Sequence, residues 1–183
     1  GEVIVRATRG GDEHRIERGQ EPQLTTDGAW AAALRLATFE ERETAEGDPP
    51  KPGAVLLRTD DGATWEFDRV KSFAFSDDGN WFALHFEADE PDSSEAESEA
   101  DEKTESEEQE EDEREAGTRA TVVRLTDQQR FDVENVTAMA FDPTSNWIAL
   151  GIATDDGEDN RLELRALVDG LAATVVHAAA AHA

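Results

Sequence analysis

The residues that could do chemistry in this chain are few, and their spacing predicts no catalytic centre. A serine hydrolase needs a nucleophile on a sharp strand-to-helix turn, usually Gly-x-Ser-x-Gly, with a histidine and an acid beside it. That pattern does not occur in the 183 residues, and the histidines are His14, His85, His177 and His182. We expect His14 in a turn, His85 within a strand face, and the last two beside a polyalanine end. These positions favour packing or solvent exposure over catalysis.

Metal and cofactor motifs are absent from the sequence as well. The chain has no cysteine, no His-Glu-x-x-His, no Gly-x-Gly-x-x-Gly and no phosphate-binding Gly-Lys-Ser/Thr. Asp155–Asn160 (DDGEDN) does not have the spacing of an EF-hand calcium loop. Asn135-Val136-Thr137 is a glycosylation sequon, a triplet that matters only in a eukaryotic secretory setting. We therefore predict no cofactor and no metal.

The charge of the chain is strongly negative and unevenly spread. It has 44 acidic and 17 basic residues, a net charge of −27, and residues 87–119 hold 17 of the acidic and 3 of the basic ones. A surface of this sign argues against nucleic-acid and anionic membrane partners. The tract has almost nothing to bury, so we expect it to be disordered. Calcium binding and the docking of a basic partner are the functional alternatives to a solvated loop.

No segment of the sequence gives a cellular address. No apolar run approaches the ~20 residues of a membrane span, and no targeting signal is present, so the compartment stays open. Frequent alanine and a preference for arginine over lysine suggest a bacterial source, cytoplasmic or extracytoplasmic. Because the chain begins Gly-Glu-Val, we expect it to be a piece of a longer protein.

Three segments of the chain repeat one pattern of strands, turns and tryptophans. They span residues 3–36, 55–86 and 121–152, and each opens with an extended run that ends at an arginine. From this arginine to the tryptophan of the same copy is 24 residues in the first segment and 23 in the other two. A fourth opening begins at Leu162 and is not completed. Self-similarity at a fixed spacing indicates a repeat architecture.

Each copy alternates apolar and polar side chains with a period of two, which is typical of strands rather than helices. Asp-Gly in residues 25–29 and 76–80 predicts tight hairpins. In the third copy Ser145 replaces the glycine, so we expect a turn of a different type. The residues that recur at matched places form a predicted structural blade motif: Trp30, Trp81, Trp147, Phe75, Phe141, Asp27, Asp77 and Asp142. A sugar-binding aromatic stripe is the alternative for the tryptophans, and blade-to-blade packing explains their repetition better.

Four short strands per copy predict an all-β fold, a partial β-propeller of about three four-stranded antiparallel blades. The predicted blades span 20–70, 70–136 and 136–177, after outer strands of a preceding blade at 1–19 and before a frayed tail at 178–183. A three-sheet β-sandwich is the alternative, but a sandwich has no reason to repeat its turn and tryptophan in register. The insertions fall between the second and third strands, so we expect them on one face, beside the links between blades.

The order of these motifs and inserts resembles the N-terminal propeller of bacterial serine peptidases of the prolyl oligopeptidase family. The resemblance covers nearly the whole chain, through RGQEPQLTTDGAWAAALRL, FEERETAEGDPPKPGAVLL, DRVKSFAFSDDGNWFALHFEAD, the Glu-rich insert and TVVRLTDQQRFDVENVTAMAFDPTSNWIALGIATDDGEDNRLELRAL. It implies a propeller that caps a separate α/β-hydrolase domain and restricts access of peptide substrates to that domain. The family's catalytic residues lie in the hydrolase domain, and no position of this chain corresponds to them.

The predicted function is therefore that of a non-catalytic segment of a serine-type peptidase. Its partners would be the α/β-hydrolase domain and further blades of the parent chain, because about three blades cannot close a ring. The alternative is a TolB- or WD-like propeller that binds proteins and carries no hydrolase. A free-standing enzyme with a site in the acidic loops is a third possibility, and it predicts peptidase activity in this chain.

Overall fold

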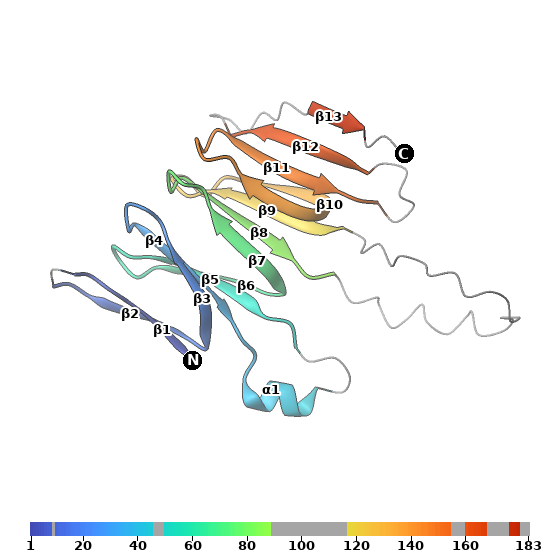
Figure 1. The fold of residues 1–183 in the computed structure, drawn as a ribbon. Helices are drawn as coiled ribbons and strands as arrows, with labels where there is room; N and C mark the ends of the chain where they lie inside the picture. Colours follow the sequence, from blue (N-terminus) through green and yellow to red (C-terminus); the bar gives the residue numbers. More distant parts are fainter. Residues whose placement is uncertain (9, 46–49, 89–116, 155–159, 168–175, 180–183) are drawn as a thin grey trace, which may run out of the picture.

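The computed structural model describes residues 1–8, 10–45, 50–88, 117–154, 160–167 and 176–179 (Figure 1). Its one helix in this part of the chain is α1 (Phe39–Thr44), and every strand pair is antiparallel. The strands are β1 (Glu2–Arg6), β2 (Glu13–Glu17), β3 (Gly19–Leu24), β4 (Trp30–Arg35), β5 (Gly53–Arg58), β6 (Thr64–Phe67), β7 (Val70–Phe75), β8 (Trp81–Phe86), β9 (Thr118–Arg124), β10 (Arg130–Phe141), β11 (Trp147–Ile152), β12 (Arg161–Ala166) and β13 (Val176–Ala179).

The strands follow one another in chain order within each sheet. A hairpin β1-β2 precedes the four-stranded sheet β3-β4-β5-β6, and the remaining strands form one ladder from β7 to β13. In β4 and β5, Trp30 lies opposite Arg58, and in β8 and β9 Trp81 lies opposite Arg124. Trp147 of β11 has the same place but lies opposite Ala166. The register therefore repeats through the chain, with alanine at the arginine position of the last copy.

Strand β10 joins two blades that the sequence presents as separate. Its first half pairs with β9 and its second half with β11, and the register shifts at Val133–Val136. Between them Asn135 has a left-handed φ of 59°. Arg18 and Arg69 have φ values of 58° and 56° at the links that precede β3 and β7. We name β3–β6 the first blade, β7 to the first half of β10 the second blade, and the second half of β10 to β13 the third blade.

The start of each insertion lies beside one of these links, as predicted. The amide of Leu36 donates to the Arg18 carbonyl at 3.2 Å, and the amide of Glu87 donates to the Arg69 carbonyl at 2.8 Å. In the third blade the amide of Ala153 donates to the carbonyl of Asn135, the corresponding link residue, at 2.8 Å. The second-to-third-strand connections of all three blades therefore begin on the face that carries the links.

The cores lie between successive sheets, which stack face to face (Figure 1). Trp30, Ala32 and Leu34 of the first blade pack against the second blade. The opposite face of the second blade, with Trp81 and Val122, packs against Ile148, Leu150 and Ile152 of the third. The β1-β2 hairpin packs on the other face of the first blade. Four-stranded antiparallel up-and-down sheets stacked in this way are β-propeller blades, so the all-β partial propeller is confirmed.

The hairpin of the third blade is the one place where the predicted turn type is wrong. Ser145 has a φ of 57°, while Gly28 and Gly79 have 72° at the same position. Its amide donates to the carbonyl three residues earlier, as those of Gly28 and Gly79 do, at 2.8–3.0 Å. The turn therefore keeps its type without glycine. A hydroxyl contact helps to hold it, because the Asp78 amide donates to Ser145 Oγ at 3.0 Å.

The connections differ from the sequence predictions at three points. Helix α1 was not predicted, and it begins with a capping box between Thr38 and Glu41. No described helix is long and apolar enough to cross a membrane. Thr118 and Arg119, assigned to the acidic insert, form the start of β9. Strand β13 takes in two alanines of the predicted frayed tail. The predicted disorder of the acidic tract concerns 89–116 and the loop DDGEDN concerns 155–159, both outside the described residues.

The two hairpin glycines offer a matched test of this turn. A Cβ at Gly79 would lie 3.2 Å from Thr25 Cβ, whereas a Cβ at Gly28 would meet nothing within 4 Å. Both residues have a φ of 72°, a conformation that costs an alanine about 1–2 kcal/mol. We therefore expect Gly28→Ala to lower the free energy of unfolding by about that amount and Gly79→Ala to lower it further. Urea denaturation followed by circular dichroism measures both, and equal losses would contradict the contact with Thr25.

Candidate functional site

A tryptophan, an arginine and an aspartate recur together in the first two blades. The guanidinium of Arg58 lies 5.9 Å from the centre of the Trp30 ring, and that of Arg124 lies 5.9 Å from Trp81. Each arginine also holds the aspartate three residues on, with Nε to Oδ1 at 2.9 Å and Nη2 to Oδ2 at 2.5 Å. A bidentate pair of this kind fixes the guanidinium plane over the indole.

The aspartates of this cluster, Asp61 and Asp127, were not among the residues predicted from the sequence. Their signal is the spacing Arg-x-x-Asp, which occurs in RTDD from Arg58 and in RLTD from Arg124. Each aspartate also accepts a backbone amide, from Ala63 at 3.1 Å and from the corresponding residue of the second blade at 3.2 Å. The arginine that ends the third strand of the first and second blades is therefore part of a fixed turn.

The pKa values of these carboxyl groups respond to the same contacts. The Arg58 guanidinium, together with the Ala63 amide, lowers the pKa of Asp61 to about 2. Arg124 lowers the pKa of Asp127 in the same way. For Asp27 the main cause of the lowered pKa is the Ala29 amide. All these groups are bound more tightly as carboxylates than as acids.

These shifts predict a loss of stability in acid. A carboxyl with a lowered folded pKa contributes stability above its unfolded pKa, about 4, and loses it as the pH falls through the folded value. For Asp61 the window runs from about pH 4 down to about pH 2. We expect Asp61→Asn to lower the melting temperature at pH 6, and the difference from the unsubstituted chain to vanish near pH 2. A difference that is constant across this range would contradict the role of the Asp61 charge.

The aspartates of the predicted blade motif do not occupy equivalent places. Asp27 Oδ1 accepts the Thr25 hydroxyl at 2.7 Å and the Ala29 amide at 3.0 Å. In the second blade its counterpart is Asp78, whose Oδ1 accepts the Ser76 hydroxyl at 2.6 Å, and not the predicted Asp77. The Asp77 backbone carbonyl instead accepts the Thr26 hydroxyl of the preceding blade at 3.1 Å.

In the third blade the hydroxyl and the carboxylate exchange positions. Asp142 stands where Thr25 and Ser76 stand, and it accepts the Trp147 amide at 2.6 Å. The hydroxyl of Thr144 donates to Asp142 from the place of Asp27. All three hairpins are therefore closed by a hydroxyl that donates to a carboxylate, but in the third blade the two groups have exchanged positions.

The aromatic residues of the motif, apart from Trp147, lie at the faces between blades. The Phe75 ring centre is 4.9 Å from that of Phe82, and Phe141 packs against the core between the second and third blades. Trp30 and Trp81 are 8% and 5% exposed, but Trp147 is 39% exposed. That these residues form a structural blade motif stays a prediction. Trp147 has the same register position as Trp30 and Trp81, but no described blade covers it.

The two histidines whose side chains the structure describes make structural contacts. His14 Nε2 lies 3.1 Å from the Thr59 carbonyl oxygen. His85 is buried, and its Nε2 lies 2.8 Å from the Val136 carbonyl oxygen and 2.9 Å from Thr118 Oγ1. A ring nitrogen this close to a carbonyl oxygen carries the proton, so Nε2 of His85 cannot act as a base toward Thr118. The side chains of His177 and His182 lie outside the described residues.

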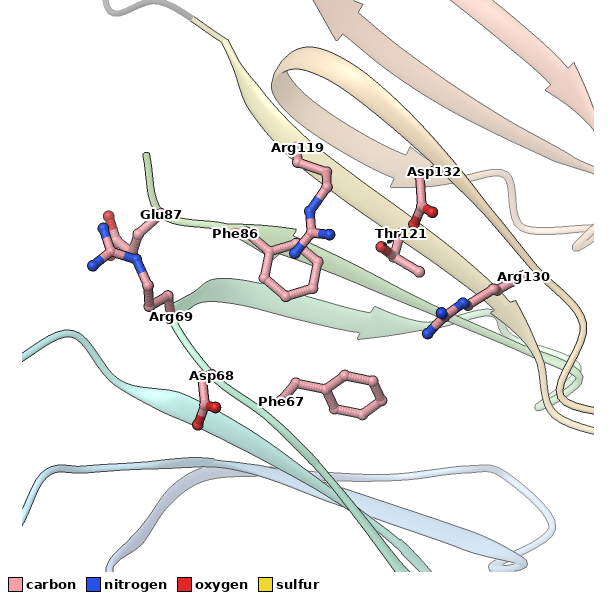
Figure 2. Close-up of a pocket in the computed structure, with 9 residues that line it drawn as sticks. All are labelled: Phe67, Asp68, Arg69, Phe86, Glu87, Arg119, Thr121, Arg130 and Asp132. Atoms are coloured by element: carbon pink, nitrogen blue, oxygen red, sulfur yellow. Dashed lines mark hydrogen bonds between the residues drawn. The ribbon is translucent and has the colours of Figure 1, made fainter. Parts of the chain in front are cut away.

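A cleft of about 350 Å³ opens between the first and second blades, on the face that carries the links (Figure 2). Nine residues from β6, β8, β9, β10 and the link line it: Phe67, Asp68, Arg69, Phe86, Glu87, Arg119, Thr121, Arg130 and Asp132. The Arg119 guanidinium lies 4.3 Å from the centre of the Phe86 ring, and Thr121 Oγ1 donates to Asp132 at 2.5 Å. The sequence motifs gave no sign of this cleft. No group of three or more potential metal ligands occurs in the described part of the chain.

Comparison with known proteins gives similarity of structure but not of sequence. No family model matches this sequence, and no curated protein matches it. The chain is similar to several solved structures at 8–11% identity. It is similar to the β-propeller domain of the Trilobed protease from Pyrococcus furiosus, at 8% identity and a TM-score of 0.48, over 96% of this chain and 48% of that one.

Two other solved structures are similar over most of this chain. Pyrococcus horikoshii acylaminoacyl peptidase is 11% identical, with a TM-score of 0.48 over 96% of this chain and 27% of that one. Kuenenia stuttgartiensis hydrazine synthase is 11% identical, with a TM-score of 0.47 over 91% and 46%. The chain thus spans about half the length, or less, of the solved structures that it resembles.

Proposed function

We propose that this chain is a non-catalytic β-propeller segment of a prolyl-oligopeptidase-like serine peptidase. In that role it supports a separate α/β-hydrolase domain and restricts the access of peptides to it. The order of blade motifs and inserts in the sequence supports the family. The stacked blades support the scaffold role, because the residues that recur from blade to blade serve packing and turn closure.

The observation that carries the proposal is the open face of the third blade. The faces that hold Trp30 and Trp81 are each covered by the following blade. The equivalent face of the third blade leaves Trp147 39% exposed, and Leu162 on the same sheet is 49% exposed. Apolar surface of this kind is stabilised by burial. The face fits a further blade of the parent chain, as a longer propeller requires.

The histidine contacts support a role without catalysis in this segment. His85 is buried as a proton donor to a carbonyl, and His14 contacts a backbone carbonyl between the hairpin and the first blade. Neither histidine is placed beside a serine hydroxyl by any hydrogen bond among the described residues. A hydrolytic centre would accordingly be supplied by another part of the parent protein.

Reading the gene beyond codon 183 tests the proposal directly. We expect further blade repeats and then an α/β domain with Gly-x-Ser-x-Gly. A stop codon after further blades, with no hydrolase region, would overturn it in favour of a protein-binding propeller.

Labelling of the purified 183-residue chain with a fluorophosphonate probe tests the non-catalytic assignment. An active serine peptidase serves as the positive control and the heat-denatured chain as the background. We expect no labelling above background. Labelling of any residue of the folded chain would contradict the assignment of chemistry to another domain.

A further inference from the structure

We infer that the cleft between the first and second blades binds a carboxylate carried on an apolar group. The inference is independent of the proposed function. It rests on a comparison of the same position in two neighbouring blades of this chain. The register identifies Thr121 with Glu163, since they lie opposite Leu84 and Leu150, each three residues after the blade tryptophan.

In the third blade this position holds a buried carboxylate between two arginines. Glu163 is 2% exposed, and its carboxylate contacts Arg165 Nε at 2.5 Å and Arg161 Nη2 at 3.4 Å. The Arg165 guanidinium also lies 5.3 Å from the centre of the Phe131 ring in the second blade. The chain thus closes the outer part of the second-to-third interface with a carboxylate, two guanidinium groups and a phenyl ring.

The first-to-second interface also has guanidinium groups and phenyl rings, but the position of Glu163 on the third strand carries no carboxylate; the acids that line the cleft, Asp68, Glu87 and Asp132, come from other strands and links. Arg119 has the register position of Arg161, and its guanidinium lies over Phe86. Thr121 takes the place of the glutamate, so its short side chain leaves open the space that the longer one would fill. Arg130 of β10 adds a second guanidinium on the other side of the cleft from Arg119, and Figure 2 shows both side chains directed toward the space between the blades.

The acidic residues around the cleft leave these two arginines available to a ligand. The Asp68 side chain is 92% exposed and lies 4.0 Å from Arg35. Asp132 accepts the Thr121 hydroxyl. Neither Arg119 nor Arg130 forms an ion pair with a carboxylate of the described residues.

The chemistry of the lining selects the kind of ligand. A guanidinium presents a planar set of N–H donors that matches a carboxylate in a bidentate way. Phe67 and Phe86 provide the apolar part of the wall. A volume of about 350 Å³ is within the range of small-molecule pockets. An aromatic or aliphatic acid, free or as the C-terminal residue of a peptide, has this combination of groups.

Isothermal titration calorimetry of the full chain at low salt tests the inference. The probes are N-acetyl-L-phenylalanine, the peptide Ala-Ala-Ala-Phe with a free carboxylate, and the C-terminal amides of both. We expect at least one acid to bind and neither amide to bind comparably. Binding of the small acid alone would indicate a free metabolite, and tighter binding of the peptide would indicate a peptide terminus. Absence of binding by both acids, or equal binding of an acid and its amide, would overturn the inference.

Variants locate the binding to the cleft. We expect Arg119→Gln and Arg130→Gln each to weaken binding about tenfold, as loss of a charge-assisted contact does. Thr121→Glu places a carboxylate of the chain itself in the cleft and should abolish binding. Arg15→Gln, in the remote β1-β2 hairpin, is the control and should leave affinity unchanged. Thermal melts establish that each variant is folded, and unchanged affinity in both folded arginine variants would overturn the site.

Discussion

Replacing Trp81 by alanine is expected to lower the free energy of unfolding by about 3–5 kcal/mol. Trp81 is 5% exposed and belongs to the core that joins the second and third blades. The substitution removes that packing and the support that the indole gives to the Arg124 guanidinium. Guanidinium chloride denaturation followed by circular dichroism measures the loss.

The same substitution at Trp147 is the matched control. Trp147 has the same register position but is 39% exposed, so its removal takes less apolar surface from the folded chain. We expect a loss below about 2 kcal/mol. Equal losses at the two positions would show that the third blade's open face is covered in solution. They would contradict the proposal that a further blade is needed to cover it.

Replacing Glu163 by glutamine is expected to lower the free energy of unfolding by about 3 kcal/mol. The change removes the negative charge of Glu163, whose residue is 2% exposed. Arg161 and Arg165 then lose the carboxylate with which they form ion pairs. Loss of one partner of a buried ion pair is costly because the remaining charges stay desolvated. Urea denaturation at pH 7 measures the change.

The control for this prediction is an exposed ion pair in the same chain. Glu2 and Arg15 are 40% and 56% exposed, with Oε1 to Nη1 at 3.1 Å. Water solvates these charges in the folded and unfolded chains alike, so Glu2→Gln should cost below about 0.5 kcal/mol. A Glu163→Gln variant as stable as Glu2→Gln would mean that the Glu163 carboxylate is hydrated.

The blade repeat could be predicted from the sequence because its signals are local. A period of two, a short hairpin and a tryptophan at fixed spacing each depend on neighbouring residues. The continuous β10 could not be predicted in this way. The short link at Asn135 turns the chain with one left-handed residue, and side-chain alternation carries no sign of that conformation. Ser145 likewise adopts the glycine conformation because Asp142 closes the turn and Asp78 contacts the Ser145 hydroxyl.

The candidate site depends on contacts that alternation does not encode. The cleft gathers residues from the end of one blade and three strands of the next, including Phe67, Arg119 and Arg130. Only the register shows that Thr121 and Glu163 are equivalent, because the lengths of the insertions hide their correspondence. The sequence contains the Arg-x-x-Asp spacing, but it does not show the contact of each arginine with the tryptophan on the neighbouring strand.

The links at Arg18, Arg69 and Asn135 have a consequence for local unfolding. Within the described residues, the β1-β2 hairpin and each blade join the next unit through one left-handed residue, and their core contacts are with immediate neighbours. Such an array behaves as a row of nearest-neighbour units, in which the ends open most easily. Amide hydrogen exchange should therefore be slowest in β8, which has a blade on each side, and fastest in the β1-β2 hairpin and in β12. Opening would proceed inward from the two ends of the row.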